Sequence, residues 1–296
     1  MSDLTPAELR VLTAVDREGS FSAAAARLGL TQSAVSYAVR GIERKIGVVL
    51  FDRDRNGARP TAAGARAVRG AHRVLRLLDV LPADARAAAG GDLSGRVRIA
   101  AFRSAAAGLL PAALAELRDR HPDLTYEVAV VRDVGPGTAG EVLAGRADLA
   151  VVNLPHRLPA SSGLVSGTLF RAPYVLVHPA GHPDPRQLPL LNWDENCAAE
   201  TRRWFAAQDW LPPAHITVAD DSALLAMVGH GLGMAIVPRL TAVDLPASIA
   251  STDLGPGAPT GAVGHVSTPE LARGTAVRDL LRALRRVGAG LRAQEH

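Results

Sequence analysis

Helix start and stop signals follow one another closely in the first fifty residues, and this feature constrains the fold more than any other. Thr5, Pro6 and Glu8 form the pattern of a capping box with proline in the first helical turn, and Gly19 supplies a stop signal. A first helix is therefore predicted over residues 6–18.

Two further helices follow after very short connections. Ser20 caps a helix predicted over residues 21–28, and Thr31 caps a helix predicted over residues 32–46 after a turn that contains Gly29. Two short helices joined by a tight glycine-containing turn, with the second one longer and polar, form a helix-turn-helix candidate. In that motif the second helix enters the major groove of DNA.

The third predicted helix carries hydrogen-bonding side chains on or beside the face opposite its apolar residues. Glutamine can pair bidentately with adenine, arginine with guanine or phosphate, and hydroxyl groups with either. The same residue types also suit an ordinary solvated face, so the helix alone leaves both interpretations open. The side chains concerned are Gln32, Ser33, Ser36, Tyr37 and Arg40.

Residues 48–61 favour the DNA-binding interpretation. The apolar run from Val49 to Phe51 predicts a short strand, and Asn56-Gly57 is a strong signal for a hairpin turn. A basic hairpin directly after a helix-turn-helix is expected of a winged helix, whose wing lies along the phosphate backbone, although charged loops are also common at ordinary surfaces. The arginines around the turn are Arg53, Arg55 and Arg59.

The charge distribution points to the same part of the chain. The 296 residues carry a formal net charge of +4, but residues 1–90 hold 14 basic and 9 acidic side chains, a net of +5. Residues 31–76 alone carry +7, and everything beyond residue 90 sums to −1. A nucleic acid or an anionic membrane surface is therefore expected as a partner of the N-terminal third.

A pattern of fixed spacing runs through residues 14–64. It reads S-F-(S/T)-x-A-A-x-x-L, then (T)-Q-(S/P)-x-(V/L)-S, then I-x-x-(L/I)-E-x-x-(I/L)-G, then L-F-x-R and T-x-x-G. The matching residues are Ser20, Phe21, Ala24, Ala25, Leu28, Thr31, Gln32, Ser36, Ile42, Glu43, Gly47, Leu50, Phe51, Arg53, Thr61 and Gly64. This pattern resembles the N-terminal domain of bacterial LysR-type transcriptional regulators. Ser33 stands where that family often has proline, and Pro60 where it often has leucine.

The resemblance implies a winged helix-turn-helix DNA-binding domain over residues 1–60. In it, the polar residues of the third helix take the recognition role, and Arg53 with Arg55 takes the wing role. The full set expected to contact double-stranded DNA is Ser22, Thr31, Gln32, Ser33, Ser36, Tyr37, Arg40, Arg53, Arg55 and Arg59.

A long helix with an apolar seam is predicted from Thr61 to about Leu81. Apolar residues recur in it at alternating spacings of three and four, as in a coiled coil. The helix either packs on its own domain or, as the resemblance to the LysR linker helix favours, pairs with a second copy. Pro82 is expected to kink or end it, residues 83–89 to resume it and Gly90-Gly91 to form a hinge. The seam residues are Val68, Ala71, Leu75 and Leu78.

Residues 92–296 alternate between strand and helix patterns. The first part reads strand 97–101, helix 108–120, strand 124–131, helix 138–145 and strand 148–152, which predicts a parallel sheet. The second part reads strands near 174–177, 188–191, 216–218 and 234–237, helices near 198–207 and 221–230, a strand over 262–266 and a helix over 270–287.

The predicted fold class is thus α/β, with two Rossmann-like lobes after the linker. Four segments resemble the LysR effector domain, whose fold is also that of periplasmic solute-binding proteins: “LSGRVRIAAF”, “LLPAALAELRDRHPDL”, “VLAGRADLAVV” and “MVGHGLGMAIVP”. The expected domains are residues 1–60, a dimerisation helix and hinge over 61–91, and an effector domain over 92–296. Its lobe I spans about 92–167 and 262–296, and its lobe II about 168–261.

Effector contacts are expected at strand ends and helix N-termini that face a cleft between the lobes. Several candidates also suit capping or the core, and Arg103 favours a carboxylate whereas Asp220 and Asp221 favour hydroxyl or amine groups. The ligand class therefore stays open. The candidates are Phe102, Arg103, Ser104, Asn153, Leu154, Trp193, Asp194, Asp220, Asp221 and Ser222.

Enzyme signatures are weak. Gly231-Leu232-Gly233 is too short for a dinucleotide fingerprint, no P-loop occurs, and the nine histidines lack metal-ligand spacing. No catalytic residue, metal or cofactor is expected. Cys197 is the only cysteine, which excludes an intrachain disulfide and favours a reducing compartment, with an inert thiol preferred to a redox sensor.

The main hypothesis is a LysR-type regulator that binds inverted-repeat operator DNA as a homodimer or homotetramer and responds to a small-molecule effector. RNA polymerase would be a further partner if the chain activates transcription. Because no signal peptide and no run of 18 apolar residues occurs, a cytoplasmic location without a membrane partner is expected. The alternative is a cytoplasmic small-molecule-binding protein or a metabolic enzyme that uses the two-lobed domain.

Overall fold

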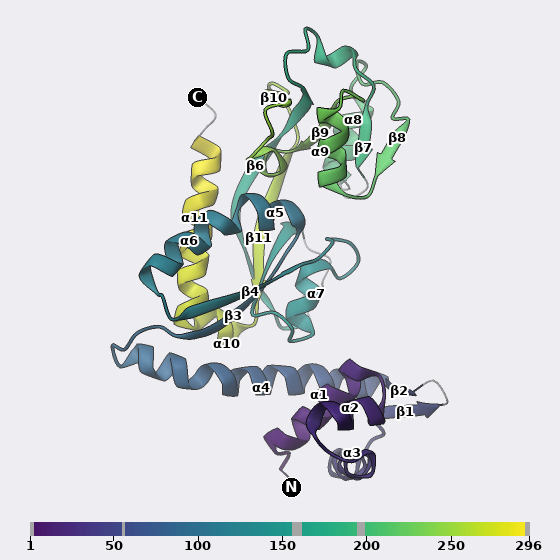
Figure 1. Ribbon diagram of the computed structural model, residues 1–296, viewed down its shortest axis with the longest axis vertical. Helices are drawn as coiled ribbons and strands as arrows, with labels where there is room; N and C mark the ends of the chain where they lie inside the picture. Colours follow the sequence, from purple (N-terminus) through teal and green to yellow (C-terminus); the bar gives the residue numbers. More distant parts are fainter. Residues whose placement is uncertain (1–2, 55–56, 156–161, 194–198, 294–296) are drawn as a thin grey trace. The chain divides into compact units, whose positions relative to one another are not determined.

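A computed structural model describes residues 3–54, 57–155, 162–193 and 199–293 (Figure 1). The chain divides into two compact units. The first contains residues 1–91 together with 143–146, and the second contains residues 92–142 and 147–296. Among the described helices, none has both the length and the apolar character needed to span a lipid bilayer.

The first unit opens with the three predicted helices. The side chain of Thr5 accepts a hydrogen bond from the Glu8 N–H at 3.3 Å, and the Glu8 carboxylate accepts from the Thr5 N–H at 2.9 Å, which confirms the capping box. Ser20 and Thr31 cap the next two helices as predicted. The helices are α1 (Pro6–Glu18), α2 (Phe21–Leu28) and α3 (Gln32–Ile46).

A two-stranded antiparallel hairpin follows, formed by β1 (Phe51–Asp54) and β2 (Gly57–Pro60). The prediction that the first strand begins at Val49 is wrong. A Glu43 carboxylate oxygen accepts hydrogen bonds from the Leu50 and Phe51 N–H groups at 2.8 and 3.3 Å, so a side chain binds the N–H groups at the point where the strand begins. Asn56 of the predicted turn lies outside the described residues.

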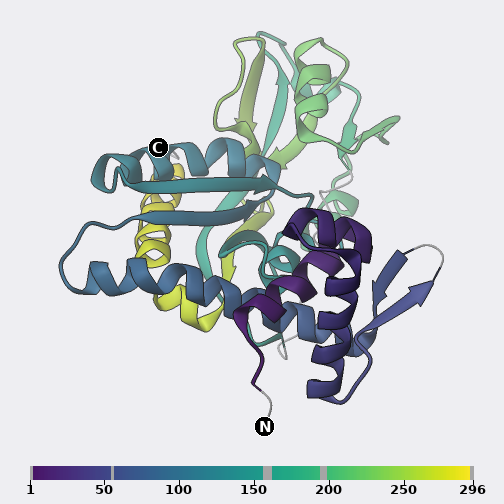
Figure 2. The ribbon, with the colours of Figure 1, turned by 60° about the horizontal axis from the view of Figure 1, so that its bottom comes forward.

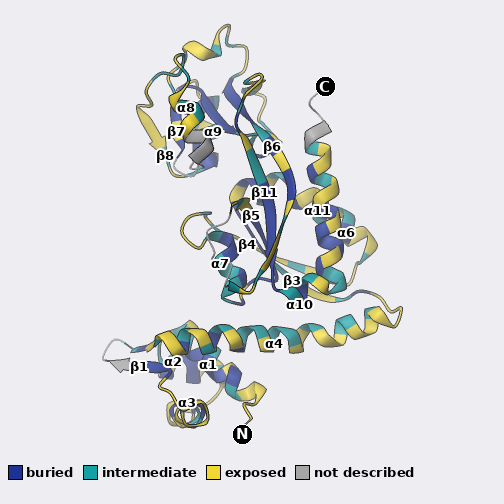
Figure 3. Cartoon of the chain, turned by 180° about the vertical axis from the view of Figure 1, so that it is seen from behind, coloured by how far each residue is buried: buried dark blue, intermediate teal, exposed yellow. Residues whose placement is uncertain are grey.

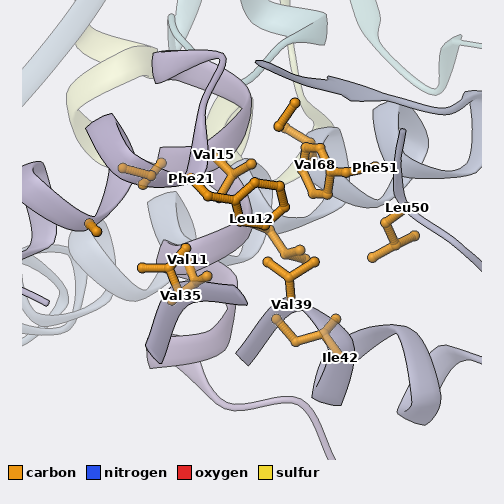
Figure 4. Close-up of a cluster of buried hydrophobic side chains, with 14 residues drawn as sticks. Val11, Leu12, Val15, Phe21, Val35, Val39, Ile42, Leu50, Phe51 and Val68 are labelled. Carbon is orange, nitrogen blue, oxygen red and sulfur yellow. The ribbon is translucent and has the colours of Figure 1, made fainter. Parts of the chain in front are cut away.

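The core of this unit lies where the three helices meet the hairpin (Figure 4). Leu12 and Val15 of α1 and Val39 of α3 are almost fully buried there. The rings of Phe21 and Phe51 meet edge to face, with centroids 6.4 Å apart, so the start of α2 is packed against the start of β1. The hairpin is thereby tied to the helices rather than to a larger sheet.

Helix α4 (Ala62–Ala88) continues through Pro82 and includes most of the residues predicted to resume it, so the alternative that Pro82 ends the helix is wrong. Proline removes one backbone donor, which leaves the carbonyl of Leu78 without an intrahelical partner. Pro82 is exposed, so water can satisfy that carbonyl. Val68 and Ala71 are buried against the N-terminal core, while the apolar residues farther along are half-buried or exposed (Figure 3).

The second unit begins with a parallel sheet in the order β4-β3-β5. The helix predicted over 108–120 is α6, and a short helix that was not predicted, α5, precedes it directly after β3. The elements are β3 (Gly95–Ala101), α5 (Arg103–Gly108), α6 (Leu110–Arg120), β4 (Leu124–Val130), α7 (Gly137–Leu143) and β5 (Leu149–Leu154).

A second βαβαβ set repeats this topology. Strands β7 and β8 are parallel, and a parallel bridge between Leu190 and Met234 joins β7 to β9, so the order is β8-β7-β9. The elements are η2 (Pro185–Gln187), β7 (Leu191–Trp193), α8 (Ala199–Ala206), β8 (Ile216–Val218), α9 (Asp221–Gly229), β9 (Ala235–Pro238), η3 (Arg239–Ala242) and β10 (Ile249–Asp253).

Two long strands connect the two sets. Strand β6 (Val165–Pro179) runs antiparallel to β11 (Thr260–Ser267) in its first part and antiparallel to β9 and β10 in its second part. The first set is parallel as predicted, and β11 and β6 add antiparallel strands beside it. Strand β6 has 15 residues instead of the four predicted, and β10 was not predicted at all.

The chain ends in α10 (Pro269–Arg273) and α11 (Thr275–Ala293), where one helix over 270–287 was predicted. Helix α11 packs against α6 and β6 (Figures 1 and 3). Thr268 caps α10 by accepting from the Leu271 N–H at 3.3 Å, and the extended backbone of Gly274 separates the two helices.

Candidate functional site

The outer face of α3 carries the polar side chains that the sequence singled out. Gln32, Ser33 and Arg40 are exposed, and Tyr37 is 71% exposed although it is a large aromatic residue. Ser22 of α2 is also exposed. The inner face of α3 packs into the N-terminal core, so the helix presents its polar face while its position is fixed from behind.

Ser36 is the one predicted contact residue of α3 that is buried, with 4% of its surface exposed. Its hydroxyl accepts a hydrogen bond from the Arg40 guanidinium at 3.1 Å. A guanidinium held by a neighbouring hydroxyl loses less conformational entropy when it binds a ligand. Ser36 is thus placed to orient Arg40 on the exposed face.

Thr31 has a structural function at the start of this helix. Its hydroxyl accepts from the Ala34 N–H at 3.2 Å and lies 3.0 Å from the Ser33 hydroxyl. The first turn of α3 is therefore capped by Thr31, and Gln32 follows immediately on the exposed surface.

The hairpin projects beside α3 (Figure 2). Arg59 of β2 is exposed and pairs in register with Asp52, and Arg53 lies in β1 opposite Ala58. Arg55 lies outside the described residues. The structure therefore brings Arg59 and the β1 position of Arg53 into one hairpin next to the polar helix.

Three residues that sequence reasoning matched without assigning a function fix this arrangement. The carbonyl of Leu50 accepts from the Thr61 N–H at 2.9 Å, and the Thr61 hydroxyl donates to the Val49 carbonyl at 2.9 Å. A Cβ at Gly64 would lie only 1.8 Å from the Leu50 oxygen, so this position requires glycine. The loop after α3 and the first turn of α4 are thus in direct contact.

Lys45, the only lysine of the chain, braces the other end of α3. Its ammonium group lies 2.7 Å from one carboxylate oxygen of Glu8 and donates to the Asp3 carbonyl at 3.2 Å. The hydrogen bond from Lys45 lowers the pKa of Glu8, with the Thr5 N–H as a second cause. Glu8 thus caps α1 and anchors α3 at once.

In the second unit, the carboxyl ends of β3 and β5 carry predicted effector residues. Asn153 binds one oxygen of Asp133 through its side-chain amide at 2.9 Å and its backbone N–H at 3.2 Å. Sequence reasoning missed Asp133, although an acidic residue just after a predicted strand was a usable signal. Phe102 and Ser104 are buried and Leu154 is half-buried.

The predicted residues Arg103, Asp220 and Asp221 come together. The Arg103 Nε lies 2.9 Å from Asp221 Oδ1, and its guanidinium also forms an ion pair with Asp220. Asp220 caps α9 by accepting from the N–H groups of Ser222 and Ala223 at 2.9 and 3.0 Å. The N-terminal ends of α5 and α9 are thus joined across the two βαβαβ sets.

The remaining predicted effector residues are Trp193, Asp194 and Ser222. Trp193 is 8% exposed and belongs to the core between β7 and α9, and Ser222 is exposed. Asp194 lies outside the described residues. Within the described ranges, no cluster of three or more histidine, cysteine, aspartate or glutamate residues could hold a metal ion.

Comparisons with known proteins match both units. The family model of the LysR substrate binding domain matches residues 90–289, and that of the LysR-family bacterial regulatory helix-turn-helix proteins matches residues 6–65. A probable HTH-type transcriptional regulator, LrrA of Synechococcus elongatus, is 36% identical over 258 residues, which cover 83% of this chain and 85% of the relative.

Solved structures share the fold. A full-length OxyR variant from Pseudomonas aeruginosa superposes with a TM-score of 0.73 at 22% identity, covering 96% of each chain. Full-length CbnR in complex with its target DNA superposes with a TM-score of 0.65 at 22% identity, covering 96% of this chain and all of that chain. The two family matches and the relative at 36% identity establish that this chain is a transcriptional regulator and belongs to the LysR family.

Proposed function

We propose that this LysR-family regulator reads inverted-repeat operator DNA with α3 and the β1–β2 wing. The observation that carries the proposal is the exposed polar face of α3, where Gln32, Tyr37 and Arg40 project from a helix whose other face is packed. Glutamine and arginine are the side chains that pair bidentately with adenine and guanine in the major groove. Residues 1–60 would form this DNA-binding domain.

The remaining DNA contacts divide by their chemistry. Ser22 and Ser33 are exposed hydroxyls that suit phosphate oxygens, and Thr31 and Ser36 act mainly by holding the helix and Arg40. Arg53, Arg55 and Arg59 of the wing would lie along the phosphate backbone. Their charge contributes to the +7 of residues 31–76.

Residues 61–91 are proposed to pair with a second copy. The exposed apolar residues Val74, Leu78 and Leu81 of α4 support this, because they leave an apolar stripe without a partner in the described chain. A homodimer places two recognition helices on successive major grooves, and assembly into a homotetramer would let the effector change the spacing between DNA-binding pairs. RNA polymerase would be a partner if the chain activates transcription.

Residues 92–296 are proposed to bind a small-molecule effector between lobe I, about 92–167 and 262–296, and lobe II, about 168–261. The Arg103–Asp220–Asp221 contact supports this location, because it lies at strand and helix ends where α/β proteins bind ligands. The chain would act in the cytoplasm by binding and not by catalysis. We expect that the purified protein does not convert the metabolite that alters its DNA binding into a product.

Operator binding tests the DNA-reading assignment. Fluorescence anisotropy with DNA from upstream of the protein's own gene should show that Gln32→Ala and Arg40→Ala each weaken binding by about 1–3 kcal/mol and relax sequence preference. Arg10→Ala, which removes an exposed arginine of α1, is the matched control and should change little. Unchanged affinity and sequence preference in both α3 variants would refute the assignment.

A further inference from the structure

Arg103 is held by two carboxylates that come from a distant part of the sequence. The arginine begins α5, directly after the first strand of lobe I, and the two aspartates begin α9 in lobe II. The Arg103 side chain is 48% exposed, whereas the Asp221 side chain is 5% exposed. Two carboxylates and one guanidinium leave the group with a formal charge of −1.

The buried position of Asp221 favours a cation at this place. Asp221 lies on the same face of α9 as Leu224 and Val228, which pack into the core of lobe II. A buried carboxylate that loses its cationic partner is strongly destabilising, because the charge is left desolvated and uncompensated. A molecule that displaces Arg103 from Asp221 is therefore favoured when it brings a positive charge of its own.

Asp220 is already oriented to receive that charge. Its Oδ1 accepts the two N–H groups of the α9 cap, and its Oδ2 faces the Arg103 guanidinium. One carboxylate is thus fixed by backbone donors and the other by packing. Both aspartates therefore have supports that do not depend on Arg103.

A second observation in the same lobe points to a ligand. Trp193 ends β7 in register with Val218 of β8, two residues before Asp220, and it packs in the same cluster as Leu224. Its indole N–H is buried and has no acceptor within the described part of the chain. An unsatisfied buried donor is costly, and an acceptor oxygen on a ligand would satisfy it.

We propose that the effector carries a guanidinium or ammonium group, and that Arg103 occupies the place of this group when the effector is absent. The inference rests on the proposed effector site and assigns its ligand class. A cation would replace Arg103 at Asp220 and Asp221, and so exchange the contact between lobes for a contact with the ligand. An anionic effector would have to compete with two carboxylates for Arg103.

Binding of small probes to the full-length protein tests the ligand class. Isothermal titration calorimetry with methylguanidinium and putrescine should detect binding, and succinate and benzoate at the same concentrations should give none. In the wild type, the Arg103 Nε–H resonance should shift as methylguanidinium is added, because the arginine leaves Asp221. Binding of the carboxylates without binding of the cations would overturn the proposal.

Two variants test whether Arg103 competes with the ligand cation for the aspartates or instead contacts the ligand itself. Arg103→Gln removes the internal competitor and should tighten methylguanidinium binding by about tenfold, whereas Asp221→Asn should weaken it by at least about tenfold. Arg118→Gln, an exposed arginine of α6, is the matched control and should leave binding unchanged. Weaker cation binding by Arg103→Gln in a folded protein would contradict the competition.

Measuring operator binding of the same proteins separates a failure of this proposal from a failure of the proposed function. A wild type that binds operator DNA but no cationic probe refutes the ligand class and leaves the regulator assignment intact. A wild type that binds methylguanidinium but no operator DNA supports the ligand class and refutes the assignment of the α3 face.

Discussion

Replacement of Gly64 by alanine should unfold the N-terminal unit selectively. The new Cβ would lie 1.8 Å from the Leu50 oxygen and 2.8 Å from its carbonyl carbon, both backbone atoms that cannot rotate away. Contacts under 3.0 Å are essentially never seen for real Cβ atoms, so the two segments must separate by roughly 1.2 Å.

The magnitude follows from the contacts that this separation breaks. The Thr61 N–H donates to the Leu50 carbonyl at 2.9 Å, and the Thr61 hydroxyl donates to the Val49 carbonyl at 2.9 Å. Two such hydrogen bonds contribute about 1 kcal/mol each, and overpacking adds about 1–3 kcal/mol. We expect a loss of about 3–5 kcal/mol in the free energy of unfolding of this unit.

Urea unfolding followed by two probes isolates the effect. The three tryptophans, Trp193, Trp204 and Trp210, all lie in the second unit, so their fluorescence reports that unit alone. Far-ultraviolet circular dichroism reports helices of both units. In Gly64→Ala the circular dichroism should show an additional transition at a lower urea concentration. The midpoint of the fluorescence transition should equal that of the wild type.

Gly70→Ala is the matched control, because it makes the same chemical change in the same helix. A Cβ at Gly70 meets no atom within 4 Å, so this variant should be neutral or more stable by up to about 1 kcal/mol. If Gly64→Ala unfolds at the same urea concentrations as the wild type, the proposed clash is refuted. An equal loss of stability in Gly70→Ala would refute it as well.

Three further predictions concern charge, pH and assembly. Operator affinity should fall steeply with salt, and Arg59→Ala should reduce the slope of log affinity against log salt by about 1, whereas an unchanged slope would exclude a phosphate contact. Burial lowers the pKa of His265 from 6.5 to about 4, with Arg285 as a second cause. The folded state therefore binds this proton less well than the unfolded chain, and up to about 3 kcal/mol of stability should be lost as pH falls from 6.5 towards 4. Urea unfolding of His265→Gln should lack that part of the pH dependence. If the stability of the variant depends on pH as that of the wild type does, the prediction is contradicted. Leu78→Glu and Leu81→Glu should produce monomers in sedimentation velocity, and dimers of wild-type strength would refute pairing through α4.

Elements whose signals are local were predicted to the residue. The bounds of α1, α2 and α3 agree with the sequence prediction because side chains such as Thr5 and Ser20 cap the next turn, within three residues. The start of β1 was missed by two residues because Glu43, from the preceding helix, binds the N–H groups of Leu50 and Phe51. A capping side chain lies within three residues of the N–H group that it binds, so the local sequence reveals it. Glu43 is seven and eight residues away from the two N–H groups that it binds, so the local sequence does not reveal this contact.

Strand direction and length depend on partners that the local sequence does not specify. Strand β6 extends to 15 residues because β11 pairs with its first part and β9 and β10 with its second part. Its sequence contains Pro173 and Arg171, which weaken a strand signal. At Pro82 the sequence left two alternatives open, and the helix continues because an exposed proline in a long helix costs one hydrogen bond that water can replace.

The candidate effector site shows the same division between local and distant information. Sequence reasoning placed Arg103 and Asp220 near a common site because both follow strands, but it treated their preferences for opposite ligand charges as a conflict. The ion pairs with Asp220 and Asp221 remove that conflict, since the arginine satisfies the aspartates. Under the proposal their charges describe one site in two states, with either Arg103 or a ligand cation against the same carboxylates, and an anionic ligand would have to compete with both carboxylates for Arg103.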